Sequence, residues 1–200
     1  GQYVNDVNIP FQTHCYIIRS PHAHAKIKKL DVSNAVKAPG VLNIFSGSDV
    51  AEDNLGTPGM AAQRKRPDGS DMWAPPQTPL ALDKVRYVGD PIAMVIAKTL
   101  DQAKYAAELV EINFETLPSV TSTARTIEPG CPLVWDQIPD NISNVFEAGD
   151  AEATEKLIKN AAKLVKRRFV ITRVHAQFME PRGAIGEYNQ RNGRYTLYAD

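Results

Sequence analysis

One stretch of the sequence, residues 85–118, constrains the fold more than any other. Six consecutive apolar residues, Ile92–Ala97, lie between the dipeptide Asp90-Pro91 and Lys98. An apolar run of this length, bounded by turn signals, is typical of a strand that is buried on both faces. The sequence therefore predicts a central strand here, with the rest of a domain arranged around it.

A helix is predicted directly after this strand. Thr99 and Gln102 have the spacing of a capping box, and the helix is expected to span residues 100–111. The small and apolar residues that fall on one face are Ala103, Ala106, Ala107 and Val110. Alternating polarity over residues 110–115 then predicts a half-buried strand that ends before Pro118. The unit is therefore predicted to be strand, helix, strand.

Shorter elements are predicted on both sides of this unit. Before it, the sequence predicts strands at residues 13–19, 25–31, 41–45 and 80–85, a helical turn at 33–37, and a helix capped by Ser48. After it, the sequence predicts a helical turn within 120–128, a strand at 166–174, and a hairpin of 184–188 with 194–199. A helix capped by Asp150 is predicted before this strand. The apolar stripe of that helix consists of Ala153, Leu157, Ile158, Ala161 and Val165. Strands and helices mixed in this way indicate an α+β fold.

Charge and cysteine content exclude several classes of function. The 200 residues carry 23 basic and 23 acidic side chains, a balance that favours binding neither to nucleic acid nor to an anionic membrane surface. Cys15 and Cys131 form no Cys-x-x-Cys motif, so no iron–sulfur or zinc site is predicted. The sequence does not exclude a disulfide bond between these two cysteines. Two free thiols are typical of a protein of the reducing cytoplasm. No apolar run is long enough for a membrane span, and no signal segment is evident.

Two pairs of side chains invite a chemical interpretation. His22 and His24 are spaced to share one face of a strand, but no third metal ligand lies nearby in the sequence, so we interpret them as structural. Glu180 and Arg182 flank Pro181, and we favour an ion pair or a backbone-binding arginine that holds the turn. The sequence therefore assigns no catalytic, cofactor-binding or metal-binding residue.

A long segment, Asp53–Pro79, shows no periodicity. Glycine and proline interrupt it repeatedly, and the basic cluster Arg64–Arg66 lies inside it. Loops of this length are uncommon in compact domains and are often functional. Two interpretations remain open: a surface excursion without chemistry, and a loop that gates substrate entry or binds a partner.

Four segments, in this order along the chain, resemble the large subunit of molybdenum hydroxylases, the family of xanthine dehydrogenase, aldehyde oxidase and aerobic carbon monoxide dehydrogenase. They are Arg19–Ile27, Ala38–Val41, Val85–Ala93 and Ala106–Pro118. The resemblance implies an α/β hammerhead domain at 1–118, a linker at 119–144, and at 145–200 the first strands and helix of a molybdopterin-binding domain. Both ends of the chain look cut, so a piece of a longer polypeptide is expected.

The resemblance also implies a function. The family hydroxylates aldehydes or N-heterocycles with water, using molybdenum-molybdopterin, here expected in its cytosine dinucleotide form. An iron–sulfur small subunit would hold [2Fe-2S] clusters and a medium subunit would hold FAD, in a dimer of heterotrimers. The family's catalytic and cofactor residues would fall beyond Asp200, so these 200 residues alone are expected to be inactive. The alternative is a stand-alone hammerhead-fold module for binding or subunit interaction, without catalysis.

Overall fold

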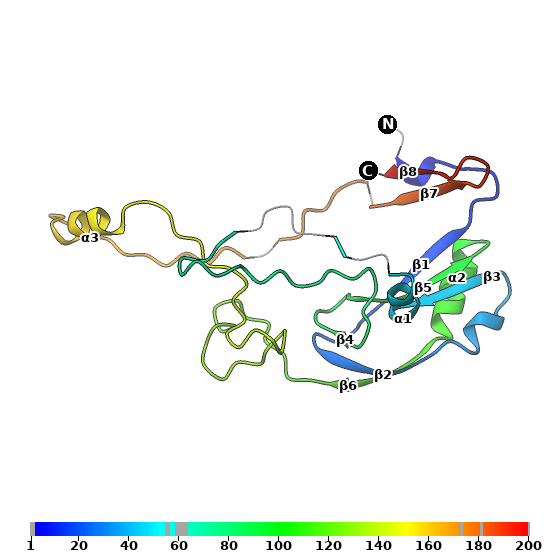
Figure 1. Cartoon of the computed structure of the whole chain (residues 1–200), viewed down its shortest axis with the longest axis horizontal. Coiled ribbons are helices and arrows are strands. Elements are labelled where there is room, and N and C mark those ends of the chain that lie inside the picture. Colours follow the sequence, from blue (N-terminus) through cyan, green and yellow to red (C-terminus); the bar gives the residue numbers. More distant parts are fainter. Residues whose placement is uncertain (1–2, 55–56, 59–63, 173, 181, 200) are drawn as a thin grey trace. The chain divides into compact units, whose positions relative to one another are not determined.

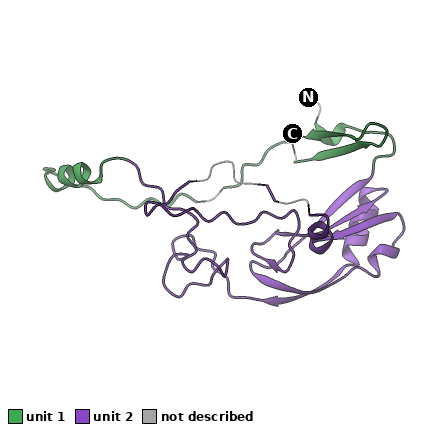
Figure 2. Cartoon of the chain, viewed as in Figure 1, with its two compact units in different colours: residues 1–12, 149–200 green, residues 13–148 purple. Residues whose placement is uncertain are grey.

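The structure is a computed structural model that describes residues 3–54, 57–58, 64–172, 174–180 and 182–199. The chain divides into two compact units (Figure 2). Unit 2 comprises residues 13–148, and unit 1 comprises residues 1–12 with 149–200. None of the helices in the described ranges is long and apolar enough to cross a membrane.

Two antiparallel three-stranded sheets form the frame of unit 2 (Figure 1). The first sheet has the order β1–β5–β3 and contains β1 (His14–Arg19), β5 (Pro91–Ala97) and β3 (Val41–Ser46). The second has the order β4–β2–β6 and contains β4 (Lys84–Val85), β2 (Ala25–Asp31) and β6 (Glu111–Thr116). Odd-numbered strands therefore lie in the first sheet and even-numbered strands in the second.

The central strand is β5, as its apolar run predicts. It pairs with β1 on one side and β3 on the other, and Val95 lies opposite both Tyr16 and Ile44. One face of β5 is completely buried, at Ala93, Val95 and Ala97. On the other face Ile92 is buried, whereas Met94 and Ile96 are half-buried. The predicted strand forms, but it is fully buried on one face only.

The helix after it, α2 (Leu100–Glu108), begins where predicted and ends three residues early. Thr99 Oγ1 accepts a hydrogen bond from the backbone N–H of Gln102 at 3.2 Å, which is one half of a capping box. Ala103 and Ala106 are completely buried in the core of the first sheet. The predicted end at Glu111 is wrong because Glu111 is already the first residue of β6.

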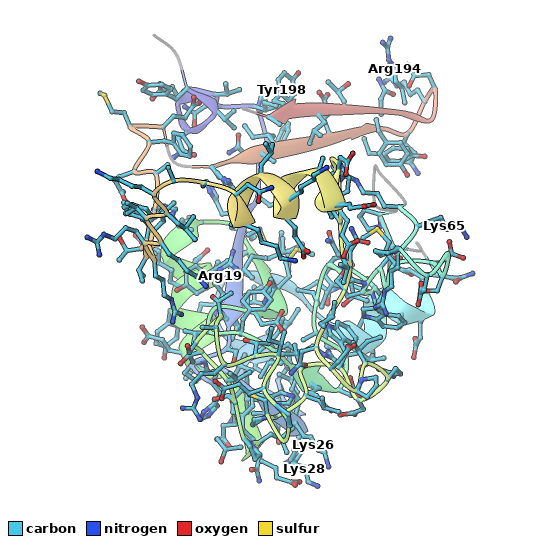
Figure 3. All side chains as sticks on the ribbon, turned by 90° about the vertical axis from the view of Figure 1, so that its left-hand side faces the viewer. Arg19, Lys26, Lys28, Lys65, Arg194 and Tyr198 are labelled. Carbon is cyan, nitrogen blue, oxygen red and sulfur yellow. The ribbon has the colours of Figure 1, made fainter. Side chains whose placement is uncertain are left out.

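The strands on either side of α2 lie in different sheets. β5 belongs to the first sheet, whereas β6 pairs with β2, with Phe114 opposite Ile27 and Ile112 opposite Leu30. Lys26 and Lys28, close together in Figure 3, reach across this pairing to Glu115 at 3.9 and 2.8 Å. The strand–helix–strand unit therefore links two sheets.

Two predicted boundaries in unit 2 are wrong. The helix α1 (Gly47–Glu52) is capped by Ser46, whose backbone N–H and hydroxyl both bind Asp49, and not by Ser48. The predicted strand at residues 80–85 is reduced to β4, because Leu80 and Ala81, although buried, lie outside any strand. The helical turn η2 (Ala35–Lys37) falls where one is predicted.

The helical turn predicted within residues 120–128 does not form. Arg125 N–H donates to the Ser122 carbonyl at 3.0 Å, and Glu128 N–H donates to the Arg125 carbonyl at 3.0 Å. These bonds close successive turns that do not continue as a helix.

Unit 1 contains the short helix η1 (Val4–Asp6), the helix α3 (Ala151–Lys159) and the hairpin of β7 (Ala184–Asn189) with β8 (Arg194–Ala199). Asp150 caps α3, as predicted, by accepting the Ala153 N–H at 2.9 Å. The helix ends at Lys159, however, so the last two residues of the predicted apolar stripe lie beyond it.

The strand predicted at 166–174 is not formed by its described residues. Residues 166–172 and 174 are exposed coil, and none of them pairs with another described strand. Their β-branched and aromatic side chains favour a strand, yet a strand needs a neighbour to complete its backbone hydrogen bonds.

Candidate functional site

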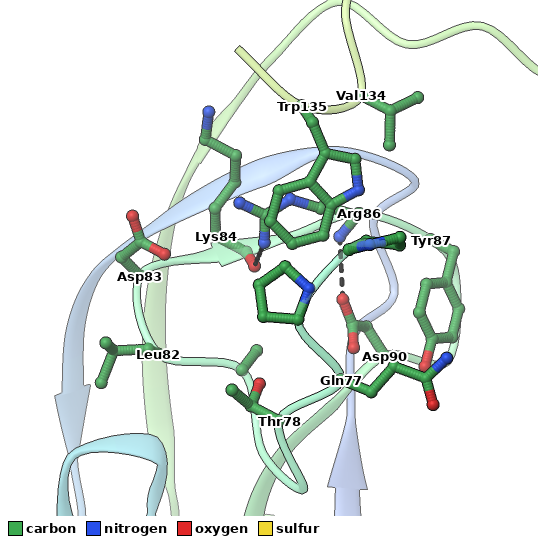
Figure 4. Close-up of a pocket in the computed structure, with 13 residues that line it drawn as sticks. Gln77, Thr78, Leu82, Asp83, Lys84, Arg86, Tyr87, Asp90, Val134 and Trp135 are labelled. Atoms are coloured by element: carbon green, nitrogen blue, oxygen red, sulfur yellow. Dashed lines mark hydrogen bonds between the residues drawn. The ribbon is translucent and has the colours of Figure 1, made fainter. Parts of the chain in front are cut away.

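A pocket of about 640 Å³ opens in unit 2 beside the Gly89 turn (Figure 4). Its walls come from residues 75–78, 81–84, 86–87, 90 and 134–135. This volume is in the usual range for small-molecule sites. The pocket therefore joins the end of the long aperiodic loop, the turn before β5, and the segment that the sequence predicts to be a linker.

The guanidinium of Arg86 is fixed on one wall of the pocket. Its central carbon lies 3.6 Å from the ring centroid of Trp135, a cation–π contact, and its Nη1 donates to the Lys84 carbonyl at 3.1 Å. Its Nε is buried and has no hydrogen-bond partner in the described part of the chain. Burial lowers the pKa of Arg86, and the carboxylates of Asp83, Asp90 and Asp136 oppose that shift.

The turn at Gly89-Asp90 places a carboxylate at the pocket. Gly89 adopts φ +91°, a conformation that favours glycine, and its N–H donates to the Ser20 carbonyl at 2.8 Å. Asp90 Oδ2 accepts the backbone N–H of Arg86 at 2.9 Å. Burial, followed by the nearby Asp90 carboxylate, raises the pKa of Tyr87. Asp90 therefore both closes the turn and faces the Tyr87 hydroxyl.

Lys84 is a nearly buried cation whose partner lies at the surface. Its Nζ is 2.8 Å from Asp136 Oδ2, and the two side chains are 8% and 73% exposed. The hydrogen bond and charge of Lys84 lower the pKa of Asp136. The pair fastens β4 to the segment that carries Trp135.

The described part of the long loop is fastened to residues 131–146, and we name this set of contacts the clasp. Arg66 Nη2 donates to the Ile142 carbonyl at 2.5 Å. The backbone N–H of Trp73 donates to the Ser143 carbonyl at 2.9 Å, and Ser143 Oγ donates to the Trp73 carbonyl at 2.7 Å. The two indoles, Trp73 and Trp135, meet edge to face with centroids 6.2 Å apart. Residues 64–79 are therefore packed against other parts of unit 2.

Asn141 stabilises the backbone conformation of the segment that contacts the long loop in the clasp. Its backbone has φ +56°, and its side-chain amide donates to the carbonyls of Thr126 and Pro132, both at 3.0 Å. Its Oδ1 accepts the Val134 N–H at 2.9 Å. Asn141 thereby positions Val134 and Trp135 at the pocket, a role that the sequence pattern does not indicate.

The sequence does contain one signal for this site. The chain has two tryptophans, Trp73 and Trp135, and both fall in segments without periodicity. Large aromatic side chains bury much apolar surface when they are packed. Their presence in apparent loops indicates that these loops are folded.

The two histidines considered as metal ligands both make packing contacts. His22 meets Phe114 edge to face at 4.8 Å between ring centroids. His24 is 9% exposed, and its Nδ1 lies 2.9 Å from the Pro118 carbonyl, to which it donates in the Nδ1–H tautomer. Across the described ranges, no group of three or more His, Cys, Asp or Glu side chains could hold a metal ion.

Of the second candidate pair, Glu180 makes a structural contact. Glu180 Oε1 accepts the Val4 N–H at 3.3 Å, which ties η1 to the segment before β7 within unit 1. The sequence favours Arg182 as the backbone-binding group, whereas the structure gives a backbone contact to Glu180. Pro181, between them, lies outside the described residues.

The strands β7 and β8 of unit 1 do not enclose the molybdopterin group that the resemblance implies. The side chains of β7 and β8 are almost all exposed. A Cβ atom added at Gly186 or Gly193 would meet nothing within 4 Å, so neither glycine forms a close-fitting cradle. We therefore assign none of these residues to the cofactor.

Comparison with known protein families gives two matches along the chain. Residues 1–118 match the model described as "Aldehyde oxidase and xanthine dehydrogenase, a/b hammerhead domain". Residues 134–200 match the model described as "Molybdopterin cofactor-binding domain".

Several curated proteins are similar over 99% of the chain. The nicotine 6-hydroxylase large subunit of Paenarthrobacter nicotinovorans is 33% identical over 198 residues, which cover 23% of that protein. The carbon monoxide dehydrogenase large chain of Afipia carboxidovorans is 30% identical over 211 residues, which cover 25% of it. The chain thus spans about a quarter of the length of these relatives.

Solved structures support the same assignment. Quinoline 2-oxidoreductase from Pseudomonas putida 86 superposes with a TM-score of 0.87 at 31% identity, covering 100% of this chain and 24% of that chain. A carbon monoxide dehydrogenase from Oligotropha carboxidovorans superposes with a TM-score of 0.86 at 30% identity, covering 100% of this chain and 25% of that chain. The fold is therefore α+β, a hammerhead domain followed by the start of a cofactor-binding domain, and the chain belongs to the aldehyde oxidase and xanthine dehydrogenase family.

Proposed function

We propose that this chain is the N-terminal part of the molybdopterin-binding large subunit of a molybdenum-dependent oxidoreductase that hydroxylates aldehydes or N-heterocycles with water. The observation that carries this proposal is the order of the two family matches, with the hammerhead model at 1–118 and the cofactor-binding model at 134–200. The names of two similar proteins, one for nicotine and one for quinoline, support an N-heterocycle as the substrate class.

The proposal includes the remaining parts of the enzyme. Molybdenum-molybdopterin is expected in its cytosine dinucleotide form, and separate subunits would carry [2Fe-2S] clusters and FAD in a dimer of heterotrimers in the cytoplasm. The names of the similar proteins, which are large subunits or large chains, support an assembly of several subunits. When bound, the molybdenum cofactor supplies the redox chemistry.

The role we assign to these 200 residues is structural. We propose a hammerhead domain at 1–118, a connecting segment at 119–144 and the start of the cofactor domain at 145–200. The clasp supports the view that the connecting segment is an ordered part of the scaffold, since Trp73 and Ser143 hold each other by two hydrogen bonds.

The experiment that tests the proposal uses the complete protein. The whole reading frame, co-expressed with its neighbouring subunit genes, should give a complex that contains stoichiometric molybdenum by elemental analysis. That complex should oxidise aldehydes or N-heterocycles with an artificial electron acceptor, whereas residues 1–200 alone should do neither. A purified complex without molybdenum would overturn the proposal.

A stand-alone binding module is the second candidate function. The pocket of about 640 Å³ favours it, because the pocket is built entirely from residues of unit 2. This alternative requires a natural protein that ends soon after residue 200, and mass spectrometry of the endogenous protein separates the two cases.

A further inference from the structure

We propose that one face of the β7–β8 hairpin is a docking face, and that polypeptide following residue 200 in the complete subunit covers it. This inference rests on the proposed function, since it takes these 200 residues to be the N-terminal part of a longer chain. It goes further by naming the surface that the remainder of that chain must bury.

The two faces of the hairpin differ in polarity. Residues directly opposite each other in an antiparallel pair share a face, and successive residues of a strand alternate between faces. One face, which we name the apolar face, carries no charged side chain and consists of Ala184, Gly186, Tyr188, Tyr195, Leu197 and Ala199. Both charged residues of the two strands, Glu187 and Arg194, lie on the opposite face, where Tyr198 Oη donates to Glu187 Oε2 at 3.4 Å. Only the opposite face therefore resembles an ordinary solvated surface.

The apolar face is open. Tyr188, Tyr195 and Leu197 are 54%, 78% and 71% exposed, and the two tyrosine rings pack on each other with centroids 4.6 Å apart. A contiguous exposed apolar surface marks an interaction site. A hairpin of two strands alone is at best marginally stable in water, so these strands need a partner on this face.

Unit 1 offers no cover of its own. None of the residues that the structure describes in this unit is buried. Its other large apolar side chains are also exposed, among them Leu157, Phe169 and Ile171. Burial of apolar surface is what offsets the loss of conformational entropy on folding. The cover must therefore be present whenever unit 1 folds.

The later part of the same polypeptide is the occupant that meets this requirement. Residues 134–200 match the cofactor-binding domain model, and the chain spans about a quarter of the length of its relatives. In a subunit of that length, about three quarters of the polypeptide lies outside these 200 residues. A segment of the same chain is always available, whereas cover by a partner subunit or a second copy depends on concentration.

The test measures how fast a cysteine on the apolar face reacts with a maleimide. Leu197→Cys is introduced into the full-length large subunit, purified without its partner subunits, and labelling is located by mass spectrometry of the peptide. The native protein should react at least about a hundred-fold more slowly than the same protein in urea, because the face must open before it reacts. Ala184→Cys, a smaller change on the same face, keeps the test valid if Leu197→Cys does not fold.

Thr196→Cys is the matched control, because Thr196 neighbours Leu197 in β8 and lies on the opposite face. Its native rate should stay within about ten-fold of its rate in urea. Equal protection of the two cysteines, or none at Leu197→Cys, would overturn the proposal. Protection that appears only with the partner subunits, or only at high protein concentration, would assign the face to a partner or a second copy and overturn it as well.

Gly186 gives an independent readout in the middle of the apolar face. A Cβ atom added there meets no described atom within 4 Å, so Gly186→Val should not destabilise an uncovered hairpin. Glycine inside a strand often marks the close approach of another backbone. We therefore expect Gly186→Val to lower the thermal midpoint of the full-length subunit by at least about 2 °C, and Thr196→Val to leave it unchanged. An unchanged midpoint in Gly186→Val would count against close cover.

Failure of this inference can be told apart from failure of the proposed function. A subunit that protects Leu197→Cys but assembles without molybdenum would overturn the proposed function and support the docking face. A molybdenum-loaded, active complex in which Leu197→Cys reacts freely would overturn the docking face alone.

Discussion

At the scale of single residues, the ion pair of Lys84 with Asp136 joins a nearly buried cation to an exposed anion. Replacing Asp136 by Asn should leave Lys84, 8% exposed, without its partner. We expect a loss of about 1 kcal/mol in the free energy of unfolding, well below the cost for a fully buried pair because Asp136 faces water. Urea unfolding measures this change.

The matched control is Asp71→Asn, since the partners Lys65 and Asp71 are both exposed and their loss should have no measurable effect. The pKa of Asp136 is lowered in the folded protein, so its contribution is complete above the unfolded value of 3.8 and disappears as the pH falls below it. The difference between wild type and Asp136→Asn should therefore shrink below about pH 4. A difference that grows in acid would contradict this assignment.

Asn141 combines a left-handed backbone with three side-chain hydrogen bonds. Asn141→Ala should cost about 2–3 kcal/mol, because it loses the bonds and places a Cβ-bearing residue without compensation at φ +56°. Asn141→Gly should cost about 1 kcal/mol less, since glycine adopts this conformation freely. Tryptophan fluorescence during urea unfolding reports on the clasp directly, because both tryptophans lie in it. Equal losses in the two variants would exclude a backbone contribution.

At the scale of elements, α2 lies against the turn that precedes β3. Gly40 has φ +80°, and a Cβ added there would overlap the side-chain amide of Gln102. We expect Gly40→Ala to destabilise the fold by about 1–2 kcal/mol through backbone conformation, with a further cost from the overlap. Thermal unfolding followed by circular dichroism measures the total.

The second variant, Gln102→Ala, separates the two costs. The Gln102 Oε1 atom is buried and has no partner in the described ranges, so its removal alone should be nearly neutral. In the double variant the overlap is gone and only the backbone cost remains, so the two changes should be less than additive. Strict additivity would show that Gln102 does not restrict residue 40.

The local elements could be predicted from the sequence because their signals are local. Ile92–Ala97 is apolar throughout and forms β5, and Thr99 and Asp150 cap the helices that follow them. The pattern also predicts a strand at 166–174, where the described residues form none. The residue types of a segment indicate whether it favours a strand conformation. Whether the strand forms also depends on a neighbouring strand with which it can pair, and the local pattern does not identify that neighbour.

The candidate site could not be predicted in this way because its contacts are distant in sequence. Ser143 and Trp73 are 70 positions apart, and Arg66 and Ile142 are 76 positions apart. Periodicity compares residues a few positions apart and carries no information at such separations. The long loop and the predicted linker therefore look independent in the sequence, although they bind each other.

At the scale of the whole molecule, the chain differs in how well its cations are protected. Lys163, Lys166, Arg167 and Arg168 lie in exposed coil, whereas the lysines of β2 lie in a strand that is hydrogen-bonded to β6. A protease needs an unfolded segment of backbone, so trypsin should cut within 163–168 at least about ten-fold faster than within 25–31. Mass spectrometry of a limited tryptic digest measures the relative rates of cleavage in the two segments. First cuts within β2 would contradict the described pairing.

The assignment of successive strands to opposite sheets constrains how this protein is made. Neither sheet is encoded by a contiguous piece of the gene, so any truncation between residues 14 and 116 removes strands that one or both sheets require. The first sheet can be completed only after Ala97 has been synthesised, and the second only after Thr116 has been synthesised. Completion of both sheets must therefore await the synthesis of residues 91–116, and neither sheet can be excised or transplanted without the other.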